Sequence, residues 1–273
     1  MPQFPSYTRR EILLGAGAAL SAPLSAETRQ EKGQRLIDES LAALGGQPFV
    51  NLSNVVTTGR AYSFYNTRLR GLAVMTIYDR FEPMQENADR DWLPISRREL
   101  YTEKGDYYAL FRNGKGWEVT YRGARPQPKE TMQRYRLAAR RDFFYFLRYR
   151  LNESGLYYYF SGTEIVDNTP TDAVEITDAE GESFTIYIRQ SDHLPVSQVY
   201  IRRDPKTRIP YEERTVWSKF RSVENVILPW NIRRERDGEK IFELFGRTFQ
   251  INQQIDATLF ELPGGITVLP EAP

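Results

Sequence analysis

The sequence predicts a mainly β protein of the α+β class, built from antiparallel strands with one buried face and a few amphipathic helices. Aromatic residues make up 13% of the chain, with 17 Tyr and 15 Phe, although the mean hydropathy is only −0.57. Apolar and polar residues alternate with a period of two in many segments, which is typical of strands with one wet face. The turns between these segments are too short for the crossovers that parallel strands need.

Residues 1–26 have the pattern of a bacterial export signal. Arg9 and Arg10 precede a short apolar run, and small residues ending at Ala26 offer a cleavage site. The apolar run is shorter than the roughly 18 residues that span a bilayer. The paired arginines favour the twin-arginine route, and an ordinary Sec signal is the alternative. We expect residues 27–273 to form one mature, periplasmic domain.

Composition excludes several kinds of site. The chain has no cysteine, so a disulfide, a thiolate metal site and a cysteine nucleophile are impossible. Removing residues 1–26 takes away Arg9, Arg10 and Glu11 and lowers the formal charge from +1 to zero. Neither this charge nor any motif indicates a nucleic-acid partner. We expect a soluble monomer without cofactor or metal.

The mature chain opens with a helix and a first block of strands. Residues 28–45 carry apolar residues at helical spacing and end at Gly45-Gly46, which permits a left-handed cap. Residues 82–96 are predicted to be a loop, and Asn113-Gly114 is a strong hairpin turn. Strands are expected at about 53–65, 69–81, 97–103, 106–112 and 116–122.

Residues 129–151 are predicted to form one amphipathic helix, because apolar residues follow one stripe and the segment has no Pro or Gly. A second block of strands follows it. Phe184, Ile186 and Ile188 alternate there with polar residues, and so do Val199 and Ile201, so we expect both sets to face the concave side. These strands are expected at about 156–166, 171–178, 182–189, 194–203, 210–222, 226–235 and 239–252.

Few residues suggest catalysis. The single histidine, His193, follows Asp192 in a predicted turn, where Asp more often bonds its own backbone than orients a base. An acidic pair on opposing strands could in principle hydrolyse glycosides, but the carboxylates alternate with Arg and Lys as on a solvated sheet face. No phosphate loop, nucleophile elbow or dinucleotide fingerprint is present.

The aromatic run from Phe143 to Leu147 is the most specific feature of the mature chain. It permits three interpretations: ordinary core beneath the sheet, the wall of a cavity for acyl chains, or a basic helix on an anionic membrane. The pattern by itself does not choose among them.

The order of elements resembles the LolA/LolB-like family of bacterial outer-membrane lipoprotein-sorting carriers. The likeness covers the mature chain, and no single motif defines it. The motifs that carry it are Thr58-Gly59-Arg60-Ala61, Asn113-Gly114-Lys115-Gly116-Trp117, Asp192-His193-Leu194-Pro195, Val226-Ile227-Leu228-Pro229 and the closing stretch that ends Leu259-Phe260-Glu261-Leu262-Pro263.

The resemblance implies a strongly curved, unclosed antiparallel half-barrel whose concave face is covered by helices, with a hydrophobic cavity between. It implies that residues 129–151 form part of a lid and that an arginine holds the lid shut, with Arg60 and Arg80 as the candidates. The residues expected to line the cavity are Phe143, Phe146, Leu147, Met75, Ile77, Phe184, Ile186, Ile188, Val199 and Ile201.

The resemblance further implies a periplasmic carrier or binding protein, not an enzyme, that shelters the acyl chains of a lipoprotein or lipid. Its partners would be that acylated ligand and a membrane-associated donor or acceptor protein. Two alternatives belong to other classes. One is a sensing or scaffolding domain of the same fold that binds a protein, and the other is a periplasmic hydrolase with an acidic pair in its cavity.

Overall fold

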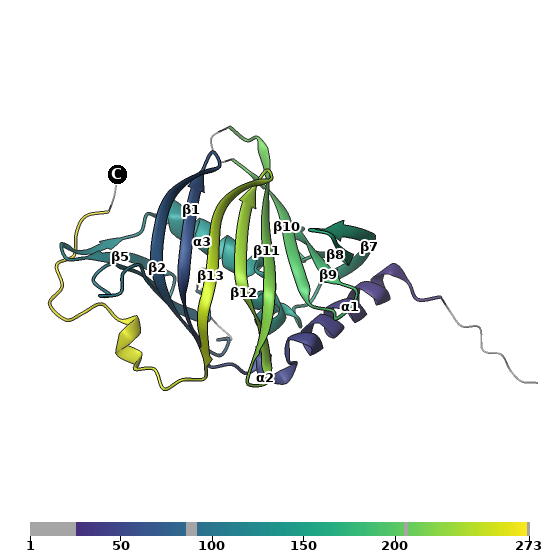
Figure 1. Cartoon of the computed structure of the whole chain (residues 1–273), viewed down its shortest axis with the longest axis horizontal. Helices are drawn as coiled ribbons and strands as arrows, with labels where there is room; N and C mark the ends of the chain where they lie inside the picture. Colours follow the sequence, from purple (N-terminus) through teal and green to yellow (C-terminus); the bar gives the residue numbers. More distant parts are fainter. Residues whose placement is uncertain (1–25, 86–91, 205–206, 272–273) are drawn as a thin grey trace, which may run out of the picture.

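The computed structural model describes residues 26–85, 92–204 and 207–271. Its thirteen strands form one sheet in the order β6-β5-β4-β3-β2-β1-β13-β12-β11-β10-β9-β8-β7. Two meanders are joined through the antiparallel pair of β1 and β13, so β6 and β7 form the edges (Figure 1). Within the described residues no pairing joins the two edges, and the sheet is the predicted unclosed half-barrel.

The strands agree closely with the segments predicted from the alternation of apolar and polar residues. The sequence missed β6, because the Pro-containing stretch after residue 122 indicated the end of the meander. The strands are β1 (Asn54–Tyr65), β2 (Arg68–Phe81), β3 (Ile95–Leu100), β4 (Tyr108–Arg112), β5 (Lys115–Thr120), β6 (Gly123–Pro126), β7 (Tyr157–Val166), β8 (Thr169–Thr177), β9 (Ser183–Arg189), β10 (Pro195–Arg203), β11 (Pro210–Val223), β12 (Val226–Arg236) and β13 (Glu239–Ile251).

Helices cover the concave face of this sheet. In Figure 1, α3 lies behind β1, β13 and β12, and α1 lies beside β7 to β9. Helix α1 begins at a capping box in which the Glu31 amide donates to the Thr28 hydroxyl, and it ends at Gly45, whose φ is 120°. The helices are α1 (Arg29–Leu44), α2 (Gln47–Val50), α3 (Lys129–Arg141), α4 (Phe143–Tyr145), the π-helix η1 (Phe146–Arg150) and the 3-10 helix η2 (Ala257–Phe260).

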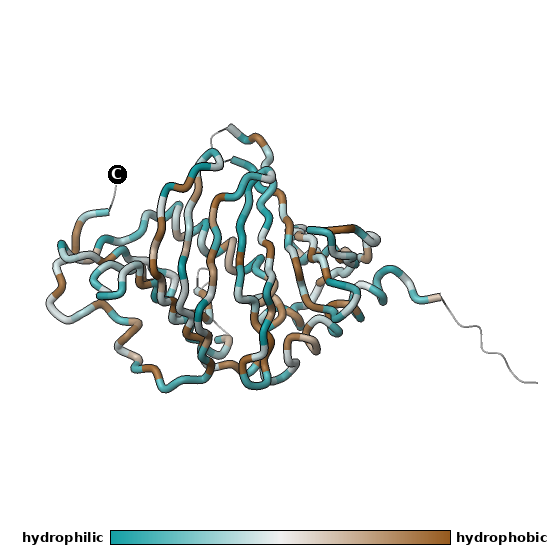
Figure 2. Tube along the Cα trace, viewed as in Figure 1, coloured by the Kyte–Doolittle hydropathy of each residue, from teal (hydrophilic) through white to brown (hydrophobic). Residues whose placement is uncertain are grey.

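The main core lies between the helices and the concave side of the strands. Figure 2 shows hydrophobic and hydrophilic residues alternating along the strands, as a half-wet sheet requires. The rings of Phe146 and Phe184 meet edge to face at 5.6 Å and tie η1 to β9. The fully buried side chains of this cluster include Ile37, Leu44, Phe143, Phe146, Leu147, Val174, Ile176, Ile186, Ile188 and Val226.

The predicted single helix over residues 129–151 is wrong, because the chain leaves helical geometry at Asp142 (φ −61°, ψ 129°). The buried side chain of Gln198 satisfies the interrupted backbone: its amide nitrogen donates to the Arg141 carbonyl at 2.5 Å, and its oxygen accepts from the Phe143 amide at 2.9 Å. The Asp142 carboxylate then caps α4 by accepting from the Tyr145 amide at 3.0 Å. A break in a helix needs such partners, since unpaired buried amides are costly.

The prediction that Val199 and Ile201 face the concave side is also wrong. In the pairing of β9 with β10, Pro195 opposes Ile188 but Ser197 opposes Tyr187, so Val196 is an extra, bulged residue. The bulge reverses the alternation, and Val199 therefore opposes Thr185 on the convex side. There Val199 packs beside Tyr187, and Ile201 is 60% exposed.

The chain after β13 covers part of the convex side. The guanidinium of Arg98 on β3 donates to the Leu259 carbonyl at 2.9 Å, and Phe260 is buried against Tyr108 and Leu110 of β4. Residues 26–85, 92–204 and 207–271 contain no helix that is long and apolar enough to cross a membrane.

Gly59 marks a second irregularity, at the pair that joins the two meanders. The register of β1 and β13 shifts between Thr58 and Gly59, and a Cβ added at Gly59 would lie 2.3 Å from the Phe245 carbonyl oxygen. Only glycine permits this approach of two backbones.

We predict that Gly59→Ala lowers the free energy of unfolding by about 1 to 3 kcal/mol, the usual cost of overpacking, because the two strands must move apart. Gly264→Ala is the control, since a Cβ there meets nothing within 4 Å, and we expect a change within about 0.5 kcal/mol. Urea unfolding of both variants measures the difference. Equal stability of the two would contradict the packing role of Gly59.

Candidate functional site

A cavity of about 540 Å³ lies between the concave face of the sheet and the lid, which we define as residues 129–150 (α3, α4 and η1). The neighbouring α2 closes one end. This volume falls within the range of pockets that hold one small ligand. The wall is formed by Phe49, Leu52, Val55, Thr57, Met75, Ile77, Asp79, Phe81, Ile95, Arg97, Glu99, Tyr101, Phe111, Tyr135, Ala138, Ala139, Asp142, Phe144, Tyr145, Arg148, Tyr149, Thr215, Trp217, Leu228, Pro229, Ile232, Arg234, Phe242, Leu244 and Phe249.

One part of the wall is apolar and rich in aromatic side chains. Phe144 of the lid meets the Trp217 ring edge to face at 5.0 Å and lies 5.9 Å from the Phe49 ring of α2. Leu228 and Phe249 line the same cavity from β12 and β13. An apolar, concave wall of this kind holds a hydrocarbon chain without directional bonds.

Another part of the wall is charged. Arg97 on β3 makes two hydrogen bonds to the Asp79 carboxylate of β2, at 2.5 and 2.8 Å. The Tyr101 hydroxyl donates to Glu99 at 2.9 Å. Burial by itself lowers the pKa of the Arg97 guanidinium, but Asp79 outweighs it and the pKa is raised. Burial also raises the pKa of Tyr101, and the charge of Glu99 adds to this effect.

Each of the three carboxylates that the described part of the chain contributes to the wall already has a hydrogen-bond partner. Asp79 accepts from Arg97, Glu99 accepts from Tyr101, and Asp142 accepts from the Tyr145 amide. Burial raises the pKa of Asp142, although the Tyr145 amide and two arginines oppose the effect. Hydrolysis by an acidic pair needs one carboxyl that gives a proton to the substrate and one that activates water. The commitment of these groups to the protein itself argues against that chemistry.

Arg148 of η1 connects the lid to α2. Its guanidinium donates to the carbonyls of Phe49, Val50 and Leu52 at 2.6, 2.8 and 2.7 Å, and it lies 3.9 Å from the Phe81 ring centre. Burial lowers the pKa of Arg148 to about 10, so the group is charged at neutral pH. Arg148 therefore has the geometry of a residue that holds the lid closed.

The two arginines that the resemblance suggested for this task face elsewhere. Arg60 is exposed, and it alternates along β1 with the cavity-side residues Gly59 and Ala61. Arg80 lies over the Phe260 ring on the convex side, 5.8 Å from its centre. Arg148 was missed because it follows an apolar run in what looked like one regular helix. The available signal was a cation directly after the aromatic run.

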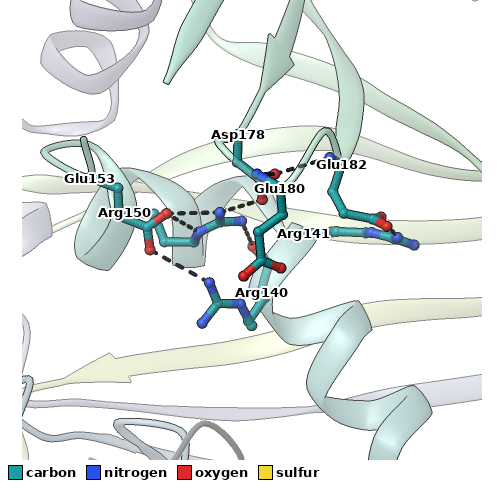
Figure 3. Close-up of polar contacts among 7 residues, drawn as sticks. All are labelled: Arg140, Arg141, Arg150, Glu153, Asp178, Glu180 and Glu182. Carbon is teal, nitrogen blue, oxygen red and sulfur yellow. Dashed lines mark hydrogen bonds and ion pairs between the residues drawn. The ribbon is translucent and has the colours of Figure 1, made fainter. Parts of the chain in front are cut away.

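The lid is also fixed to the β8–β9 turn, by ion pairs of Arg141 and of Arg150, which lies two residues after Arg148 (Figure 3). Buried Arg150 donates to Asp178 and Glu153, at 2.8 and 2.9 Å, and to the Arg140 carbonyl at 3.0 Å. Arg141 pairs with Glu182. Burial lowers the pKa of Arg150, but the two carboxylates outweigh it. Burial raises the pKa of Asp178, but Arg150 and the backbone amides of Glu180 and Glu182 together keep it low.

The structure divides the predicted wall residues into three groups. Met75 and Ile77 line the cavity. Val199 and Ile201 lie on the convex side of the sheet. The remaining six, Phe143, Phe146, Leu147, Phe184, Ile186 and Ile188, are buried in the packed core beside the cavity, and Phe144 and Tyr145 take their place in the wall.

A second depression and the single histidine lie outside this cavity. A depression of about 850 Å³ beside α1 is lined mainly by charged and polar side chains of that helix and opens to solvent. His193 lies in the β9–β10 turn with its Nδ1 3.3 Å from the Glu39 carboxylate of α1, and it does not line the cavity. Among the described residues, no group of three or more His, Asp or Glu could hold a metal ion.

No protein-family model matches the sequence, and no curated protein matches it. Solved structures match the fold. A DUF1329 family protein from Desulfovibrio piger is 12% identical, with 86% of this chain and 98% of that chain covered and a TM-score of 0.56. A putative outer membrane lipoprotein-sorting protein domain from Vibrio parahaemolyticus is 8% identical, with 85% and 97% covered and a TM-score of 0.53.

A LolA superfamily protein from Nitrosomonas europaea is 11% identical, with 83% of this chain and 96% of that chain covered and a TM-score of 0.48. At these identities a likeness shows the fold alone. The two structures with TM-scores above 0.5, the DUF1329 family protein and the lipoprotein-sorting domain, share the fold of this chain, which is the half-barrel that the sequence resemblance predicted.

We predict that Arg148→Met loosens α2, because three backbone carbonyls lose a charged donor, and each such bond contributes about 1.5 to 3 kcal/mol. Hydrogen exchange of the amides of residues 49–52 should become at least about tenfold faster, while exchange in β8 and β9 stays unchanged. Arg60→Met, the same change at an exposed arginine, is the control. Unchanged exchange at residues 49–52 would show that Arg148 does not hold this end of the cavity.

Proposed function

We propose that this protein is a carrier or binding protein that shelters the acyl chain of a lipid or lipoprotein in the cavity under its lid. The observation that carries the proposal is the cavity of about 540 Å³, whose aromatic wall is closed by helical segments attached through Arg148. The likeness to a lipoprotein-sorting domain supports the same function. Binding, with no chemical step, is the expected activity, since the carboxylates in the wall are engaged with the protein.

Desolvation would supply the affinity. Burying about 15 methylene groups offers roughly 12 kcal/mol before ordering costs, at about 0.8 kcal/mol per group. The apolar wall from Phe144 and Trp217 to Leu228 and Phe249 gives such a chain a continuous surface. Release to a membrane or to an acceptor protein would require the lid to move away from the sheet.

A cavity-filling pair of variants tests this function. Ala139 and Leu137 lie on the same helix, but Ala139 lines the cavity whereas Leu137 is 37% exposed. We predict that Ala139→Trp weakens binding of the neutral fluorescent probe N-phenyl-1-naphthylamine by about tenfold or more, since displacing two methylene equivalents costs about 1.6 kcal/mol. Leu137→Trp should bind the probe like the unchanged protein.

Thermal unfolding of both variants shows whether each is folded. Equal probe affinity in the two variants would move the binding site away from this cavity. A protein that binds neither the probe nor any long-chain amphiphile would refute the proposed function.

We also propose that the protein acts in the periplasm, after removal of residues 1–26, which lie outside the described residues except for Ala26. Because the exit from the apolar run offers a signal-peptidase site ending at Ala26, the exported chain should begin at Glu27 on N-terminal sequencing. Replacing Arg9 and Arg10 together by Lys should block export by the twin-arginine route. Unchanged export would indicate a Sec signal, and a mature chain that keeps the leader would contradict cleavage.

A further inference from the structure

Among the residues that the structure describes, three arginines line the cavity, and they differ in what they bind. Arg97 is paired with Asp79, and Arg148 is occupied by three backbone carbonyls. Arg234 of β12 has neither kind of partner: among the residues that the structure describes, no carboxylate oxygen lies within 4.0 Å of its guanidinium. It is thus the cavity arginine whose donors are available to a ligand.

Within the described part of the chain Arg234 has no ion-pair partner, and other arginines surround it. On the same side of the sheet, Arg202 and Arg236 share the single carboxylate of Glu213, at 3.3 and 3.4 Å. Asp142 on the lid accepts from the Tyr145 amide. Burial raises the pKa of Asp142 and the charge of Arg234 lowers it, but the two groups form no ion pair. The strands β10 to β12 therefore present an excess of positive charge at this end of the cavity.

A second donor faces the same space from the lid. Tyr135 of α3 lines the cavity and is fixed in orientation by stacking on the Phe111 ring at 4.3 Å. Within the described residues its hydroxyl makes no hydrogen bond with another side chain or backbone group. Burial raises the pKa of this hydroxyl, and the charges of Arg97 and Arg234 oppose the effect. The carboxylates of Asp79 and Glu99 also act on it, so the hydroxyl lies in the polar part of the cavity.

Along β12, the side chains that line the cavity change from apolar near Leu228 to cationic at Arg234. Leu228, Pro229, Ile232 and Arg234 all line the cavity. The six residue steps from Leu228 to Arg234 span about 20 Å at roughly 3.3 Å per residue. A chain that starts at Arg234 can therefore extend along β12 toward Leu228 and the aromatic wall.

We propose that the cavity selects a single-chain amphiphile with an anionic head, a carboxylate or a phosphate monoester, which Arg234 and Tyr135 bind while the tail lies along the apolar wall. A guanidinium suits this head because its fork of donors matches two oxygens of either anion. The inference rests on the proposed function, since it assigns the ligand's head group in the same cavity.

Competition against N-phenyl-1-naphthylamine tests the inference with three ligands of equal chain length: laurate, monododecyl phosphate and dodecanol. We expect at least one of the two anions to displace the probe at a concentration about tenfold lower than dodecanol does. A hydrogen bond between charged groups changes a binding affinity by about this factor. The better of the two anions identifies the head group.

Arg234→Gln should remove this preference, weakening the anion about tenfold and leaving the affinities for dodecanol and for the probe unchanged. The control Arg60→Gln makes the same change on the convex side and should keep the preference. Equal competition by all three ligands in the unchanged protein, or a preference that survives Arg234→Gln, would overturn the inference while the proposed function stands. If none of the three ligands displaces the probe, both the inference and the proposed function fail.

Discussion

The cavity depends on one buried side chain, Gln198, and on the bulge that directs it inward. Without the extra residue Val196, the alternation along β10 would place Val199 on the concave side and Gln198 outside. Gln198 instead meets the carbonyl of Arg141 and the amide of Phe143, so the backbone between α3 and α4 can leave the helix without an unpaired buried group. The break lets α4 and η1 enter the core while α3 spans the cavity.

The break also explains how one aromatic run serves two surfaces. Phe143, Phe146 and Leu147 are buried in the core, whereas Phe144 and Tyr145 line the cavity. In the structure some residues of this run are core and others line the cavity, and the acyl-chain interpretation stays a proposal. An apolar wall beside committed ion pairs and one uncommitted arginine gives the cavity two chemically different ends, which suits an amphiphile better than a plain hydrocarbon.

Features with a local period were predictable from the sequence, and features set by contacts between distant residues were not. The alternation of apolar and polar residues predicted the strands, and Gly45-Gly46 predicted the end of α1. The bulge at Val196 cannot be recognised from the sequence of β10. Val199 and Ile201 alternate with polar residues as regularly as buried residues would. Arg148 could not be identified as the residue that holds the lid, because its partners are backbone carbonyls about 100 residues earlier. A sequence pattern does not predict contacts with backbone groups so far away.

The two attachments of the lid differ in physical kind, and this bears on release of a ligand. At the β8–β9 turn, buried Arg150 faces the carboxylates of Asp178 and Glu153, and separating such a pair leaves uncompensated charges at high cost. At α2, Arg148 meets only neutral carbonyls, which water can satisfy once the contact opens. Both contacts lie on η1, and the one with α2, beside the apolar wall, is therefore the cheaper of the two to open. A ligand whose head is bound at Arg234 would thus have its tail next to the weaker attachment.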